Sequence, residues 1–299
     1  MLQRMLKTKQ ILSLLDQIKK IKNKYSNQNN NKAEKIKIIL GSDGMIEINE
    51  KLIQIIKKCK ENNFSVLINT NAFLINRLTF DQLLYLGVDK FSISLDFLNK
   101  EKQNIFRGMN NSYEHIFNLI NHIKKTNNID KIGINTIIMK PNQDEIIELI
   151  KYVKKIGTHI NFQAISQPFN TPLKKNWFKD KKFNSLWPDN NIYSLIDKII
   201  LLKEKNYPIG NNIDQLNLFK EYFKNPNIRL GGVCKVPNLG IEIDSVGNLR
   251  VCPYMNPVDN IKNTDLEQVL SDKKFFDTIK NMYKCDKNCM QMVNCSYDK

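Results

Sequence analysis

The sequence lacks a long hydrophobic run and a secretory signal, and it contains very little arginine. No apolar stretch approaches the roughly 20 residues that a membrane-spanning helix needs, and the N-terminal stretch is periodic and charged, unlike a signal-peptide core. Hydrophobic residues make up 41% of the 299 positions, which is enough for a core and excludes a fibrous or wholly disordered chain. We therefore expect a globular cytoplasmic protein with no membrane segment.

The positive charge comes almost entirely from lysine. Of the 46 basic residues, 41 are Lys and 5 are Arg, against 30 acidic residues, so the formal net charge is +16. Surfaces that bind nucleic acid favour the planar, bidentate Arg, and the 41 Asn beside the many Lys and Ile indicate codon bias. We interpret the lysines as solvated helix faces. Lysine-driven RNA binding is the alternative, and it predicts a steep salt dependence.

Apolar segments and amphipathic segments alternate along the first half of the chain. The apolar segments predict strands at 35–40, 64–70, 90–95, 131–139 and 158–166. The amphipathic segments predict helices near 7–22, 49–62, 79–86, 112–125 and 142–156. Parallel strands need such helical crossovers, so we expect a helix-covered parallel sheet, either a barrel or a doubly wound sheet. In both folds the functional groups follow the C-terminal ends of the strands.

The alternation is expected to stop after Pro168. Residues 169–230 contain both Trp residues and a helical pattern near 192–205, and they predict a helical connector packed on the sheet. Beyond Gly231, two short strands around Gly247 predict a hairpin. A helix precedes the first predicted strand, so we expect the barrel to lack an initial strand.

Cysteine is concentrated at the end of the chain. Five of the six cysteines lie in the last 66 residues: Cys234, Cys252, Cys285, Cys289 and Cys295. Without a secretory signal, this clustering indicates a metal site before disulfides. Four or five thiolates can hold zinc or an iron–sulfur cluster, and the two-residue CxxC knuckles typical of zinc ribbons are absent. An iron–sulfur cluster, zinc and unliganded thiols all stay open on the spacing alone.

Several segments, taken in order, resemble the radical S-adenosylmethionine (SAM) superfamily. They are GSDGMI (41–46) at the place of the family's glycine-glycine-acid-proline motif, INTNAFLIN (68–76) at its TNG segment, SISLD (92–96) at its ribose-side strand, and FRG (106–108) at its RG motif. The tail order of Cys234, Gly247, Cys252-Pro253 and a Cys-rich terminus resembles the auxiliary-cluster domain, of SPASM or twitch type, that follows many of these enzymes.

The resemblance implies an α/β fold with three parts. Residues 1–168 would form an incomplete parallel (β/α)6 partial TIM barrel, 169–230 the connector, and 231–299 a small Cys-rich α+β domain that holds a 4Fe–4S cluster. The family's CxxxCxxC loop, whose three thiolates leave one iron open to SAM, is absent from the sequence. We expect either a chain that starts downstream of that loop or a relative that kept the fold and lost the radical step.

The resemblance also implies SAM-binding roles for six side chains at strand ends: Asp43, Asn69, Asn71, Ser94, Asp96 and Arg107. Asp43 would accept the amino group, and Arg107 would pair with the carboxylate through a charge-assisted bond. Ser94 and Asp96 would bind the ribose hydroxyls. The plainer alternatives are a turn or helix cap at Asp43, a surface cation at Arg107, and a capped strand end at Ser94 and Asp96.

The implied activity is reductive cleavage of SAM to a deoxyadenosyl radical that abstracts hydrogen from a peptide or a small-molecule substrate. A reductant such as flavodoxin or ferredoxin would be needed. Without the CxxxCxxC ligands, the chain by itself is not expected to cleave SAM. The rival hypothesis is a noncatalytic iron–sulfur or zinc scaffold that binds a peptide across the open barrel.

Overall fold

The structure is a computed structural model, and it describes most of the chain. The described residues are 5–29, 35–41, 50–168, 171–227, 234, 236–238, 240–262, 264–285 and 289, with the side chains of 26–29 excepted.

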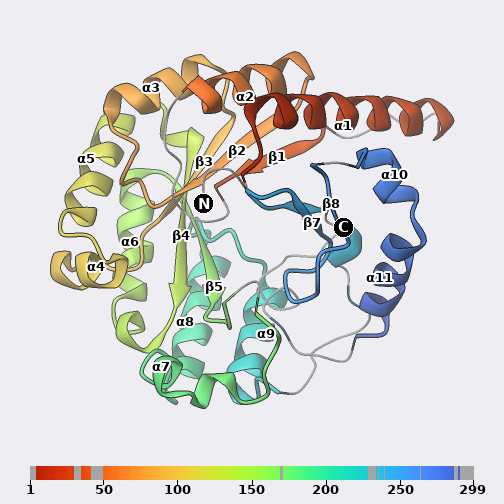
Figure 1. Cartoon of the computed structure of the whole chain (residues 1–299). Coiled ribbons are helices and arrows are strands. Elements are labelled where there is room, and N and C mark those ends of the chain that lie inside the picture. Colours follow the sequence, from red (N-terminus) through yellow and green to blue (C-terminus); the bar gives the residue numbers. More distant parts are fainter. Residues whose placement is uncertain are drawn as a thin grey trace.

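A parallel sheet forms the centre of the molecule (Figure 1). Its five strands are β1 (Lys37–Leu40), β2 (Ser65–Thr70), β3 (Lys90–Ser94), β4 (Ile132–Ile138) and β5 (His159–Ala164). They lie side by side in chain order, and each pairs in parallel with the next. A doubly wound sheet would reverse its strand order at a switch point, whereas this order continues in one direction, as in a partial barrel. The predicted parallel sheet is confirmed.

Helices cover the outer face of the sheet (Figure 1). They are α1 (Thr8–Asn29), α2 (Glu50–Glu61), α3 (Arg77–Tyr85), α4 (Lys100–Arg107), α5 (Ser112–Lys125) and α6 (Ile146–Ile156). Short 3-10 turns occur at Ile129–Lys131, Lys140–Asn142, Trp177–Lys179 and Val236–Asn238. Two differences from the sequence prediction stand out. Helix α1 continues well past residue 22 into a polar segment, and α4 was not predicted.

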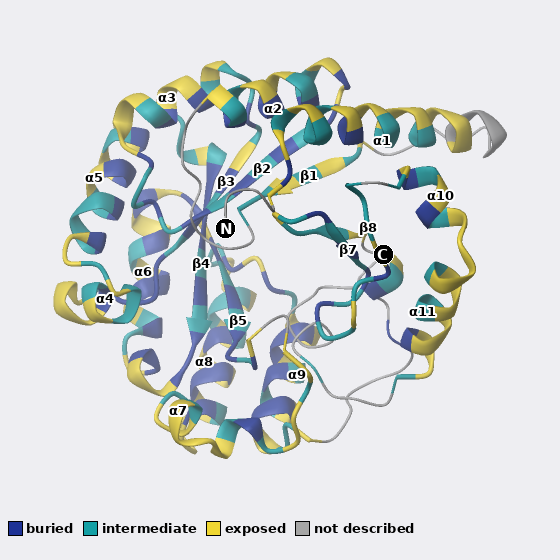
Figure 2. Cartoon of the chain, in the orientation of Figure 1, coloured by how far each residue is buried: buried dark blue, intermediate teal, exposed yellow. Residues whose placement is uncertain are grey.

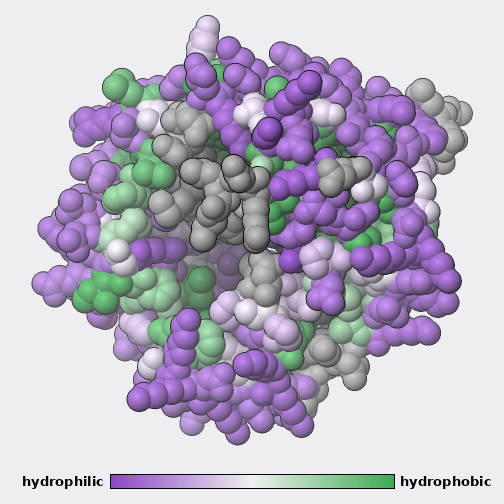
Figure 3. Space-filling model, in the orientation of Figure 1, coloured by the Kyte–Doolittle hydropathy of each residue, from purple (hydrophilic) through white to green (hydrophobic). Residues whose placement is uncertain are grey.

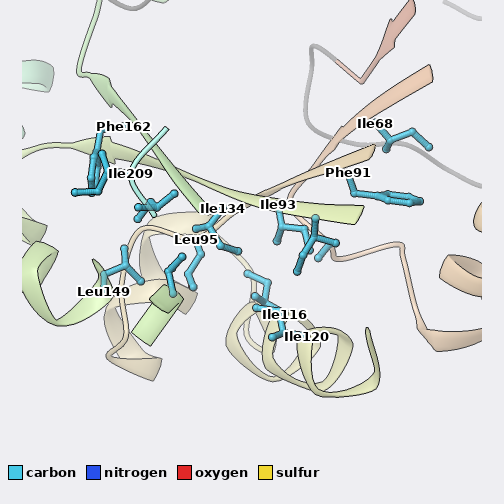
Figure 4. Close-up of a cluster of buried hydrophobic side chains, with 14 of the residues drawn as sticks. Ile68, Phe91, Ile93, Leu95, Ile116, Ile120, Ile134, Leu149, Phe162 and Ile209 are labelled. Carbon is cyan, nitrogen blue, oxygen red and sulfur yellow. The ribbon is translucent and has the colours of Figure 1, made fainter. Parts of the chain in front are cut away.

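The strands alternate between buried and partly buried residues. On β2 the residues Val66, Ile68 and Thr70 are buried while the intervening ones are not, and β3 and β5 follow the same pattern. Figure 4 shows the buried side facing the helices, with Ile93 of β3 close to Ile116 of α5. Burial of such side chains is the main force that holds helices on a sheet. Figure 2 shows the complementary result, because the outward sides of the helices are exposed.

The opposite face of the sheet carries many polar side chains beside the aliphatic Leu67 of β2 and Ile137 of β4. Its inward positions include Asn69 on β2, Ser92 and Ser94 on β3, Asn135 on β4, and Asn161 and Gln163 on β5, all of them partly buried. The register places Asn69 beside Ser92, Ser94 beside Asn135, and Asn135 beside Asn161. The inner face therefore carries amide and hydroxyl groups where a closed barrel would carry packed aliphatic side chains.

The chain returns once more to the sheet after β5, in the segment where the sequence analysis expected the alternation to stop. After α7 (Lys181–Asn184) and α8 (Ile192–Glu204), the chain returns to the sheet, and Ile209 forms a parallel bridge with Ile160. The Asn211 side chain extends this pairing, since it accepts from the N–H of Phe162 at 2.7 Å and donates to its carbonyl at 2.9 Å. Helix α9 (Ile213–Lys224) follows. The segment called a connector thus contributes a short fifth parallel pairing, beside the four that join β1 to β5.

A small antiparallel sheet stands beside the barrel (Figure 1). It contains β6 (Glu242–Ile243), β7 (Asn248–Arg250) and β8 (Asp259–Asn260), followed by α10 (Leu266–Ser271) and α11 (Lys273–Tyr283). The predicted hairpin of β6 and β7 is confirmed. Gly247 turns the chain with a φ of 88°, a left-handed value that glycine adopts without a steric penalty.

Helix α1 contacts both hydrophobic cores. Leu15 belongs to the main core between sheet and helices, and its neighbour Leu14 belongs to a second core around the small sheet. The Leu266 N–H at the start of α10 donates to the Gln17 side chain at 2.7 Å. The first described residues and the C-terminal sheet are therefore packed together. None of the described helices is long and apolar enough to cross a membrane.

One glycine on the inner face determines where a histidine ring lies. A Cβ added at Gly133 of β4 would come within 2.5 Å of the Nε2 atom of His159 on β5. Burial lowers the pKa of His159 below the usual 6.5, and the positive charge of Lys90 acts in the same direction. Because the pKa is lower in the folded than in the unfolded chain, His159 stabilises the fold above about pH 6.5, and this contribution is lost as the pH falls.

We predict that Gly133→Ala displaces the ring of His159 toward solvent and raises its pKa toward about 6.5. The measurement is an NMR titration of the His159 ring resonance, assigned with His159→Gln. The same His159→Gln variant should lose less stability than the wild type between pH 7 and pH 5. This account would be contradicted if the pKa of His159 in the wild type were 6.5 or higher, or if Gly133→Ala did not change that pKa.

Candidate functional site

The expected SAM-binding side chains lie at the carboxyl edge of the sheet, as far as they are described. Asn69 is in β2, Asn71 follows that strand, and Ser94 ends β3. The Oδ1 atom of Asn71 accepts the N–H of Phe73 at 3.1 Å, so this side chain stabilises a local turn. Asp43 lies outside the described residues.

Asp96 is the most buried of these residues. It is 1% exposed, and one carboxylate oxygen accepts the Ile137 N–H at 2.9 Å while the other is paired with the guanidinium of Arg107. Burial raises the pKa of this carboxyl, whereas Arg107 and the Ile137 N–H act in the opposite direction. A buried carboxylate of this kind persists only when it is paired and hydrogen-bonded. Both oxygens have protein partners, so the geometry fits a positioning role better than direct ribose contact.

Two side chains that the sequence analysis missed stabilise the same turn. Gln103 of α4 is fully buried, and its Oε1 atom accepts the backbone N–H groups of Asp96 and Phe97, both at 3.1 Å. Asn142 donates to the Asp96 carbonyl at 3.1 Å and to the Ile137 carbonyl at 2.8 Å. Nothing in the sequence distinguishes these amides from surface residues, because their role depends on how β3, α4 and β4 meet.

Arg107 keeps part of its hydrogen-bonding capacity. Its side chain is 19% exposed, and its Nε atom is buried with no hydrogen-bond partner among the described residues. Its guanidinium also stands 5.6 Å from the centre of the Phe106 ring. The exposed part of the guanidinium is suited to a ligand with acceptor oxygens, such as a carboxylate.

Polar side chains on the neighbouring inner face are also unpaired. The Oγ atom of Ser92 is buried and has no partner, and no hydrogen bond is found for the side chains of Asn69 or Ser94 within the described ranges. Figure 3 shows hydrophilic and hydrophobic residues mixed on this side of the molecule. Unpaired amides and hydroxyls along such a surface are suited to hydrogen-bond a polar ligand.

The described cysteines of the tail gather around Cys252. Burial raises the pKa of the Cys252 thiol, the nearby Cys234 and Cys285 thiols add to this effect, and the Tyr254 N–H, 3.4 Å from the sulfur, opposes it. Cys234 is buried in the second core, and Cys295 lies outside the described residues. In the described part of the chain, no group of three or more His, Cys, Asp or Glu side chains is close enough to hold one metal ion.

Two tyrosines connect this cysteine group to the end of β5. The Tyr254 hydroxyl donates to the Gln167 carbonyl at 3.1 Å, and the Tyr222 hydroxyl of α9 donates to the Ile165 carbonyl at 3.0 Å. Burial raises the pKa of both hydroxyls, with a further contribution from Cys289. The cysteine group therefore lies at the same edge of the sheet as Ser94 and Asp96. Elsewhere, Cys59 is fully buried in α2, as expected of a small apolar residue, and burial raises its pKa to about 12.

We predict that Asp96→Asn lowers the free energy of unfolding by about 3 kcal/mol, because the guanidinium of Arg107 loses its counter-ion in a largely buried site. Urea unfolding followed by circular dichroism measures this change. Glu148→Gln, which removes an exposed partner of Lys151, is the matched control and should cost less than about 0.5 kcal/mol. The double variant Asp96→Asn/Arg107→Met should recover part of the loss. If Asp96→Asn and Glu148→Gln lowered the free energy of unfolding equally, the buried ion pair would contribute no more to stability than the exposed one.

Comparison with known proteins gives one family for the barrel. The Radical SAM superfamily model matches residues 10–159, which is half of the chain. A GTP 3',8-cyclase from Aquifex aeolicus is 22% identical over 238 residues, covering 64% of this chain and 73% of the relative.

Solved structures share the fold over nearly the whole chain. Native anSMEcpe with bound AdoMet and Cp18Cys peptide superposes with a TM-score of 0.61 at 15% identity, covering 99% of this chain and 84% of that one. Streptococcus suis SuiB bound to the precursor peptide SuiA gives 0.57 at 16% identity, covering 94% and 64%. These similarities show the fold alone. Together with the family match over the strand and helix series, they establish that the chain belongs to the radical SAM superfamily.

Proposed function

We propose that this chain provides the SAM-binding barrel and an auxiliary iron–sulfur region of a radical SAM enzyme that modifies a peptide. The observation that carries the proposal is Arg107, which Asp96 positions at the carboxyl edge while part of its guanidinium side chain stays exposed. The peptide substrate is supported by the bound peptides in the names of the anSMEcpe and SuiB structures.

The SAM half of the site would use the residues at the ends of β2 and β3. Arg107 would bind the carboxylate of SAM, and Asn69, Asn71 and Ser94 would bind its polar groups, with Asp43 on the amino group. Asp96 would act through Arg107. When bound with a reduced 4Fe–4S cluster, SAM supplies a deoxyadenosyl radical that abstracts a hydrogen atom from the substrate.

The tail cysteines would hold the auxiliary 4Fe–4S cluster, with four ligands drawn from Cys234, Cys252, Cys285, Cys289 and Cys295. The thiolate is the form that binds iron, and the N–H of Tyr254 directed at the Cys252 sulfur partly offsets the burial that raises the pKa of this thiol. A single zinc ion bound by the same thiolates is the alternative, and the iron and sulfide content distinguishes the two. A flavodoxin or ferredoxin would deliver the electron.

The first prediction concerns the metal. The anaerobically reconstituted chain should contain about four irons and equivalent sulfide, with an EPR signal that SAM does not change, because the sequence has no CxxxCxxC triplet. Cys252→Ser should lose most of the iron, whereas Cys59→Ala, which removes a thiol from the core of α2, should retain it. Zinc without sulfide would contradict the auxiliary cluster and favour the scaffold hypothesis.

The second prediction concerns SAM. We expect Arg107→Ala to weaken SAM binding at least about tenfold, because a charge-assisted bond to the carboxylate is lost. Equilibrium dialysis with labelled SAM measures the affinity, and Arg77→Ala on the exposed start of α3 is the matched control. Wild-type chain that does not bind SAM, or Arg107→Ala that binds as well as Arg77→Ala, would reject the SAM site.

A further inference from the structure

We propose that Asn135, Asn161 and Gln163 form the surface that binds the substrate, and that they select an uncharged segment of extended peptide through its amide groups. This inference rests on the proposed function and deepens it, since it assigns residues and chemistry to the substrate half of the site.

The three amides form one patch on the inner face. Asn135 of β4 is directly beside Asn161 of β5 in the sheet register, and Gln163 is two residues further along β5 on the same face. Neighbouring strands are about 4.8 Å apart, and alternate residues of a strand are about 6.6 Å apart. In an extended peptide, the backbone amide groups that point to the same side are also about 6.6 Å apart. Asn161 and Gln163 can therefore face two successive amide groups of such a peptide.

The amide groups are available for a ligand. All three side chains are partly buried, and no hydrogen bond is found for any of them within the described part of the chain. Each offers both a donor and an acceptor, which is the complement of a peptide group. The Asn161 amide lies against Gly210, where an added Cβ would come within 2.0 Å of its Oδ1 atom. The absence of a side chain at Gly210 therefore allows the amide its present position.

The charge of the patch selects between substrate classes. From Ser92 onward, the inward positions of β3, β4 and β5 carry no Lys, Arg, Asp or Glu, and burial lowers the pKa of their one histidine, His159. The charged Lys90 at the far end of β3 donates to the Asp130 carbonyl. A nucleoside triphosphate, as in the name of the Aquifex relative, needs several cationic donors. The described inner positions provide none beside Asn135, so they suit a neutral ligand.

The position of the patch also fits a substrate. Strands β4 and β5 are between β3, which ends at the proposed SAM residues, and the segment after β5, which Tyr254 bonds to the cysteine group. A substrate held on Asn135, Asn161 and Gln163 would contact both halves of the proposed site.

The test begins with a displayed random peptide library, selected on the full chain in the presence of SAM and counter-selected on the triple alanine variant. The enriched peptide, synthesised with blocked ends, is then measured by fluorescence anisotropy. Each of Asn135→Ala, Asn161→Ala and Gln163→Ala should weaken its binding about threefold to tenfold. Gly210→Ala should act like Asn161→Ala, because the added methyl turns the amide away. Asn121→Ala, on the exposed side of α5, is the matched control.

The SAM affinity of every variant is measured in parallel by dialysis with labelled SAM. This measurement distinguishes the proposed peptide surface from the proposed SAM site. The inference is supported if the amide variants weaken the peptide and keep the SAM affinity within about twofold. It is overturned if no peptide depends on these residues, if GTP binding depends on them instead, or if SAM affinity falls with them, since the patch would then belong to the SAM site. If wild-type chain binds peptide through the patch but does not bind SAM, the proposed function fails.

Discussion

The parallel sheet has one face covered by helices and one open face, so alternate residues of each strand must be apolar on one side and can be polar on the other. The rest of the structure depends on this constraint. Helices cover the outer face, so Ile68, Ile93 and Phe162 are buried there. The residues between them point to the open face, where no helix covers them. Polar side chains at these positions need water or a ligand as a hydrogen-bond partner. A shift of one residue in register would exchange the two sets, which is why the packing of the helices also determines where Asn135 and Asn161 lie.

A buried ion pair closes the carboxyl edge of this sheet. Placing Asp96 in the interior costs solvation energy, and Arg107, the Ile137 N–H and the Gln103 and Asn142 side chains compensate it by bonding the carboxylate or the adjacent backbone. An aliphatic pair could fill the same space without that cost. The charged pair does something an aliphatic pair could not, because it orients a guanidinium whose remaining edge is directed away from Asp96.

Much of the barrel could be predicted because its strands and helices carry strong periodic patterns. The parallel sheet and the β6–β7 hairpin followed from residue patterns alone. Helix α4 could not be predicted, since its helical face buries only Gln103, and the bridge at Ile209 is too short to show a period. The placement of Asp96 depends on contacts with residues more than forty positions away, which local sequence does not encode. Asp43 and Cys295 lie outside the described residues.

The two ends of the described chain meet, and this contact joins the barrel to the cysteine region. Adjacent residues of α1 are divided between the two cores, with Leu15 on the barrel and Leu14 on the small sheet, so neither core can move independently of that helix. On the other side, Tyr254 bonds the cysteine region to the backbone after β5. The cysteine group is therefore attached to the barrel at two separated places. Two attachments fix a relative orientation where one would allow a hinge, and a fixed orientation is what a substrate needs if it is to contact both halves of the site.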